Sequence, residues 1–90
     1  MPPTSTTDDL IELLVPVWTE ALGVEASPQS EFFALGGNSL SAVAIADAVA
    51  QRYSACPGIE VVALQATFDA PTLLAMAEFV AAFINEAANA

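Results

Sequence analysis

The chain contains no histidine and no lysine, and Arg52 is its only basic residue. Without histidine a Ser-His-Asp triad cannot form, and without lysine a glycine-rich loop cannot bind phosphate as a P-loop does. A single cysteine, Cys56, excludes an internal disulfide and any zinc site with several cysteine ligands. Triad hydrolases, P-loop nucleotide-binding proteins and zinc proteins are therefore poor interpretations of this sequence.

Basic residues are scarce, but acidic residues are not: eleven Asp and Glu side chains give a formal net charge of -10. Such a chain repels nucleic acid and anionic membranes, so we expect neither as a partner. A protein partner that uses electrostatic steering should present a basic surface to it. The alternative is that the acidity only keeps an apolar domain in solution.

Long apolar runs are also missing. No run is long enough for a membrane helix, and the first nine residues lack the basic region and the apolar stretch of a signal peptide. The 90 residues, of which 56% are hydrophobic, suffice for one small core but not for two. We therefore expect one soluble, cytoplasmic domain that is a monomer.

Four stretches with helical periodicity predict an all-α fold. They cover residues 9–22, which include Pro16, residues 39–53, a short stretch near residues 64–68, and the residues from the N-cap Thr72 to residue 84. Residues 59–68, which contain the third stretch, also fit a short strand, but no second strand is available to pair with it. We expect a small four-helix bundle in residues 9–84, with a long loop between the first two helices and flexible tails at residues 1–8 and 85–90.

The long loop, residues 24–38, ends in two glycines and an asparagine directly before Ser39. Phe32 and Phe33 in this loop are strongly apolar, so we expect the loop to dock onto the core, and we expect Trp18 and the phenylalanines to belong to the core. The glycines permit a sharp turn and leave the serine accessible to a large enzyme. A serine at a helix start also lies where the helix dipole favours negative charge, such as a phosphodiester. The alternative is that Ser39 is an ordinary N-cap.

The helix predicted at residues 39–53 has apolar side chains on two faces. One stripe, which we expect to pack inward, consists of Ala42, Ile45, Val49 and Tyr53. Leu40 and Val43 lie on another face, where exposed apolar side chains beside a functional serine would form a docking patch. Alternatively, both faces are buried by the long loop and another helix.

Three motifs carry a resemblance to a known family. Residues 32–40, F-F-A-L-G-G-N-S-L, resemble the F-F-x-L-G-G-x-S-L signature of peptidyl carrier domains, the swinging-arm modules of nonribosomal peptide synthesis. Residues 18–24 are similar to the W-x-x-x-L-G-V ending of the family's first helix, and residues 68–73 to the F-x-x-P-T-L entry to its last helix. Because the motifs occur in order and span nearly the whole chain, the sequence is identified as a member of the acyl and peptidyl carrier protein family.

The resemblance implies a four-helix bundle of the acyl-carrier-protein type and a carrier without catalytic activity of its own. Ser39 would receive 4′-phosphopantetheine from coenzyme A through a magnesium-dependent phosphopantetheinyl transferase. An adenylating or acyl-loading enzyme would attach an aminoacyl or other acyl group to the arm as a thioester, and condensation or tailoring enzymes would then use it. By the same comparison these enzymes would recognise a surface made of Leu35, Asn38, Leu40, Val43 and Asp47.

Departures from the family's pattern leave the branch and the cargo open. The Gly36-Gly37 pair favours a peptidyl carrier over a fatty-acid or polyketide acyl carrier, but Asn38 stands where peptidyl carriers often have His or Asp. The stretch at residues 54–61 is longer than the usual link, which would displace the third helix, and Cys56 within it is interpreted as an incidental thiol. We expect a free-standing carrier. The alternative from another class is a helical interaction domain whose Ser39 is never modified.

Overall fold

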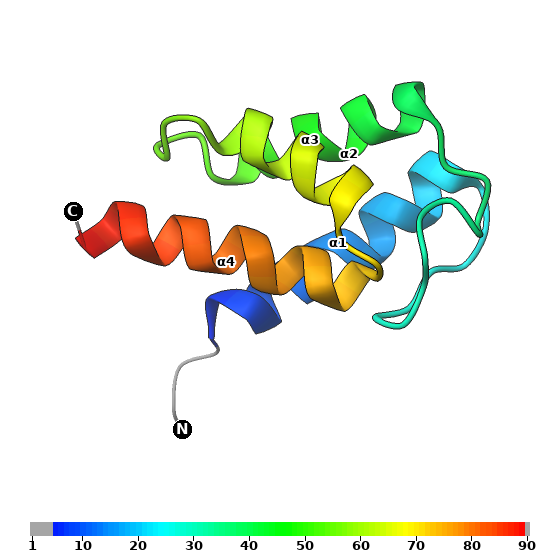
Figure 1. The fold of residues 1–90 in the computed structure, drawn as a ribbon, viewed down its shortest axis with the longest axis horizontal. Coiled ribbons are helices and arrows are strands. Elements are labelled where there is room, and N and C mark those ends of the chain that lie inside the picture. Colours follow the sequence, from blue (N-terminus) through cyan, green and yellow to red (C-terminus); the bar gives the residue numbers. More distant parts are fainter. Residues whose placement is uncertain (1–4, 90) are drawn as a thin grey trace.

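The computed structural model describes residues 5–89, which contain four helices and the segments that join them (Figure 1). The helices are α1 (Thr6–Leu22), α2 (Ser39–Arg52), α3 (Ile59–Asp69) and α4 (Leu73–Asn89). Helix α2 packs against α1 and α3, and α4 packs against the same two helices. No strand occurs within residues 5–89, so the predicted all-α class is confirmed. No helix in this range is long and apolar enough to cross a bilayer.

The first and last helices extend into the segments for which tails were predicted. Helix α1 begins at Thr6 because the Ser5 hydroxyl accepts a hydrogen bond from the Asp8 backbone N–H, 3.1 Å away, and so caps the helix. Helix α4 continues past residue 84, and the Thr6 hydroxyl donates to Asn85 Oδ1 at 3.0 Å. The start of α1 is thereby joined to the end of α4. Residues 1–4 and 90 lie outside the described range.

Helix α3 is longer than the short helix predicted near residues 64–68. Gly58, with a left-handed φ of 82°, precedes it, and the helix starts at Ile59. Ile59, Ala63 and Ala66 recur at helical spacing and are buried, so packing of this side stabilises the additional turn. Residues 59–61 therefore belong to the helix, although the sequence pattern placed them in the link from α2.

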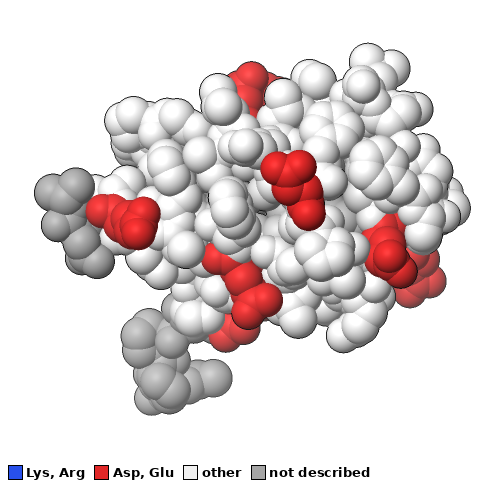
Figure 2. Space-filling view, viewed as in Figure 1, with Lys and Arg blue, Asp and Glu red and all other residues white. Residues whose placement is uncertain are grey.

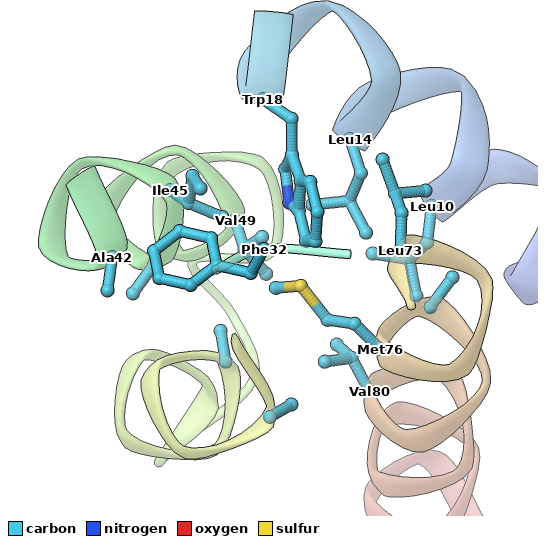
Figure 3. Close-up of a cluster of buried hydrophobic side chains, with 14 of the residues drawn as sticks. Leu10, Leu14, Trp18, Phe32, Ala42, Ile45, Val49, Leu73, Met76 and Val80 are labelled. Carbon is cyan, nitrogen blue, oxygen red and sulfur yellow. The ribbon is translucent and has the colours of Figure 1, made fainter. Parts of the chain in front are cut away.

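The core lies where side chains of all four helices meet Phe32 from the long loop. The Trp18 indole of α1 packs against the edge of the Phe32 ring, with the ring centroids 5.7 Å apart and the planes at 71°. The buried Thr67 hydroxyl donates to the Ala63 carbonyl at 2.8 Å, so its polar group is satisfied inside α3. Figure 3 shows the surrounding side chains. Of these, Ala42, Ile45 and Val49 belong to the predicted inward stripe of α2, and the others are Leu10, Leu14, Leu73, Met76 and Val80.

The loop between α1 and α2 docks onto the bundle through its backbone as well as through its side chains. The backbone N–H groups of Leu73 and Leu74, at the start of α4, donate to the carbonyls of Ser30 and Pro28, each at 2.9 Å. Amides in the first turn of a helix have no acceptor within that helix, so the loop satisfies two of them. The prediction that this loop docks is confirmed.

The two glycines before α2 are required for different physical reasons. Gly36 has a φ of 88°, which L side chains rarely adopt, and open space around it. Gly37 has no positive φ, but a Cβ at this position would lie 2.5 Å from the Phe32 ring. The predicted role of the pair, a sharp turn, therefore applies to Gly36, whereas Gly37 is needed because its backbone lies directly on Phe32.

Replacing Gly37 by alanine should destabilise the fold by about 1–3 kcal/mol, the usual cost of overpacking, because the Phe32 ring must move away from the new methyl group. Urea denaturation followed by circular dichroism measures this change. In a Phe32→Leu background the same substitution should cost less, since the smaller side chain leaves room for the methyl group. An equal cost in both backgrounds would contradict the steric explanation.

Candidate functional site

Helix α2 begins with a capping box made by Asn38 and Ser41. Asn38 Oδ1 accepts a hydrogen bond from the Ser41 backbone N–H at 3.0 Å, and Ser41 Oγ accepts one from the Asn38 backbone N–H at 2.9 Å. This pair satisfies donors that the helix itself cannot satisfy. Asn38 is therefore the N-cap, and the alternative that Ser39 caps the helix is wrong.

Ser39 is the first residue of α2, and its side chain is exposed. Because Asn38 and Ser41 form the cap, the Ser39 hydroxyl makes no hydrogen bond to any residue in the range 5–89. Ser39 therefore makes no side-chain hydrogen bond that stabilises the fold, and it lies at a helix end that is accessible from solution. The arrangement fits a residue whose partner is another molecule.

The local electrostatics at Ser39 favour an anion. The first turn of α2 contains no acidic residue, whereas α1 has Asp8 and Asp9 and α3 has Glu60 in the corresponding turn. The positive end of the α2 dipole is therefore not compensated by a carboxylate of its own first turn. The Asn38 side-chain N–H groups also have no partner in residues 5–89, so a donor is available beside Ser39.

The residues predicted to form the recognition surface lie around Ser39, but not all of them are equally accessible. Leu40 is 82% exposed and Val43 is 52% exposed, so the alternative that both are buried is wrong. Asn38 is exposed as the cap, and Leu35 is half-buried against the core. Asp47 is exposed further along the same stripe, where it accepts a hydrogen bond from the Gln51 amide at 2.8 Å.

Three phenylalanines that were predicted to be core residues are at the surface instead. Phe33, 62% exposed, and Phe68 of α3 stack with their ring centroids 6.1 Å apart and their planes at 25°. Both rings meet Phe32 edge-on, so they form an outer layer over the buried ring. Phe79 on α4 is also exposed. Because adjacent side chains point in different directions, the sequence could indicate that one of Phe32 and Phe33 is exposed, but not which one.

The far end of α2 holds the remaining reactive side chains. The Arg52 guanidinium lies 5.8 Å from the centroid of the Tyr53 ring, and Cys56 is a half-buried free thiol in the link to α3. Burial raises the pKa of Tyr53, and Asp9 adds to this while Arg52 opposes it. Figure 2 shows acidic side chains spread over one face of the molecule and no basic side chain on it. None of these groups belongs to the α2 start.

Comparison with protein-family models gave a match to the family described as a phosphopantetheine attachment site. The matched residues, 12–80, cover more than half of the chain and contain the whole of α2 and α3. Comparison with curated proteins and comparison with solved structures gave no match. Members of the matched family carry covalently attached 4′-phosphopantetheine, receive it from a phosphopantetheinyl transferase and interact with biosynthetic enzymes. The chain belongs to this phosphopantetheine-bearing family of carrier proteins.

Proposed function

We propose that Ser39 carries the 4′-phosphopantetheine arm, and that this protein presents aminoacyl or other acyl groups to the enzymes of nonribosomal peptide or hybrid secondary-metabolite synthesis. The observation that supports it best is the exposed Ser39 hydroxyl, free of hydrogen bonds within residues 5–89, at the uncompensated start of α2. The bound arm would supply a thiol that holds the acyl group as a thioester. The chain's own residues would hold the arm's phosphate and present a surface to the enzymes.

The attachment reaction requires little of this chain beyond an accessible hydroxyl. Ser39 Oγ would attack the phosphorus of coenzyme A that bears the pantetheine, and the bond from that phosphorus to the pyrophosphate bridging oxygen would break. Adenosine 3′,5′-bisphosphate would leave, and the Ser39 proton would pass to a base of the transferase. The chain has no histidine, and the first turn of α2 contains no carboxylate, so we expect the transferase to supply the base.

The start of α2 suits the phosphodiester that this reaction leaves. One negative charge would be added beside backbone N–H groups of the first turn and beside the free Asn38 amide. Such a charge at a helix N-terminus is stabilised by about 0.3–1 kcal/mol. The chain's other charges act on the phosphodiester over longer distances. Salt weakens such interactions beyond the Debye length, which is about 8 Å at physiological ionic strength.

The peptidyl branch is favoured over the fatty-acid and polyketide branches by the sequence around Ser39. The F-F-x-L-G-G-x-S-L pattern runs from Phe32 to Leu40, and it includes both glycines. The second glycine of the pattern, Gly37, has a structural reason, because its backbone lies directly on the Phe32 ring. The identity of the enzyme that loads the modified protein would distinguish the branches: an adenylating enzyme specific for an amino acid favours the peptidyl branch.

Incubation of the apo protein with coenzyme A, Mg²⁺ and a promiscuous phosphopantetheinyl transferase should raise its intact mass by one phosphopantetheine. Ser39→Ala should abolish the increase. Ser41→Ala is the matched control, because Ser41 lies two residues away and its hydroxyl is engaged in the capping box, so this variant should still be modified. An unchanged wild-type mass would support an unmodified helical interaction domain instead.

Partner enzymes are proposed to bind the exposed stripe of α2 together with the loop before it. Leu40 and Val43 supply apolar area, and Val43 lies one helical turn after Ser39 on the same side. Leu35, Asn38 and Asp47 complete the surface that the resemblance indicated, and the exposed Phe33 ring extends it. A partner with an apolar centre and a basic rim would complement it, because the carrier itself is acidic.

Val43→Asp should slow loading of the arm by the partner enzyme and leave the helical circular dichroism signal unchanged, since Val43 is half exposed. Val61→Asp on α3 is the matched control: it makes the same substitution at an exposed valine and adds the same charge. Loading rates of the two modified proteins are compared under the same conditions. Equal slowing in both would mean that net charge, rather than the α2 stripe, sets the rate.

A further inference from the structure

A groove runs along the seam between α1 and α2, and it starts beside Ser39. Its near end is lined by residues that flank the serine, and its far end lies toward the middle of both helices. Ala21 of α1 and Ala44 of α2 line both ends, so the two hollows lie next to each other along the seam. The near end is also lined by Asn38, Leu40 and Ser41, and the far end by Val17, Glu20 and Ala48.

The groove exists because small side chains lie along the seam. Ser41, Ala44 and Ala48 follow each other at spacings of three and four residues, so they form one stripe of α2. Two large side chains, Trp18 next to Val17 on α1 and Ile45 next to Ala44 on α2, point into the core instead (Figure 3). From Ser41 to Ala48 the helix rises about 10 Å, at 1.5 Å per residue.

We propose that this groove is the resting place of the arm on Ser39, with the thiol end directed toward Val17 and Ala48. The inference rests on the proposed function, because it needs the arm on that serine. The tether selects the occupant: Ser39 itself does not line the groove, but its neighbours Asn38 and Leu40 do. A group on a short flexible link beside the groove has an effective concentration of roughly millimolar there.

The order of polar and apolar lining matches the order of groups along the arm. The near end has the free N–H groups of the Asn38 amide, which suit the phosphate and the hydroxyl and amide groups next to it. The far end is lined by the apolar side chains of Val17, Ala44 and Ala48, which suit the thioester end and an acyl group. Glu20 alone adds a charge there.

The placement can be measured with a nitroxide attached through a disulfide to the arm's thiol. Cys56→Ala removes the only cysteine of the chain, so the arm carries the only thiol. A rise in mass by one phosphopantetheine is checked before labelling. The methyl signals of Ala44 and Ala48 should be broadened more strongly than those of Val43, which lies equally far along α2 on another face, and of Val61 on α3. Reduction of the nitroxide gives the reference spectrum.

Ala44→Leu should fill the groove and abolish the excess broadening at Ala48. Ala82→Leu, the same substitution at an exposed position of α4, should leave that excess intact. Broadening that is equal on both faces of α2, stronger at Val43 or Val61, or unchanged by Ala44→Leu would overturn the groove proposal alone. Failure of the mass to rise would overturn the attachment at Ser39 and the groove proposal with it.

Discussion

The burial of the Phe32 ring is the constraint on which the start of α2 depends. The ring is enclosed by the Trp18 indole on one side and the Gly37 backbone on another, and the Gly37 N–H donates to the Phe32 carbonyl at 2.9 Å. This tight turn fixes the backbone up to Asn38, which then caps the helix. Because Asn38 performs the capping, Ser39 is left with an unengaged hydroxyl. An accessible serine is thus the consequence of a buried aromatic ring seven residues earlier.

An acidic carrier must accept one further negative charge at Ser39 if the proposed attachment is correct. The chain has a formal net charge of -10, and its one base, Arg52, lies at the opposite end of α2. The phosphodiester would therefore depend on short-range donors, namely the helix amides and the Asn38 side chain. Charge repulsion is spread over the surface and weakened by salt, whereas hydrogen bonds act directly at the phosphate. The absence of acidic residues from the first turn of α2 is the feature that makes this balance possible.

The sequence was sufficient for the helices with clear periodicity and for the chemistry of the α2 start. It misjudged features that depend on contacts between distant segments. Helix α3 starts at Ile59 because of tertiary packing, which the ambiguous pattern of that stretch does not contain. The start of α1 lies beside Asn85, a contact between residues 79 positions apart that no local pattern reveals. Likewise, Phe32 and Phe33 are chemically identical, and only the fold determines which of them is buried.

Helix α2 would serve two purposes with two of its faces. The stripe of Leu40, Val43 and Asp47 faces solvent and is proposed for enzymes, whereas Ala44 and Ala48 floor the proposed groove for the arm. Leu40 belongs to both, because it is 82% exposed and also lines the mouth of the groove. An enzyme that covers Leu40 would therefore change the groove's mouth as it docks. Docking and release of the arm would then be coupled through a single side chain, without a change in the fold.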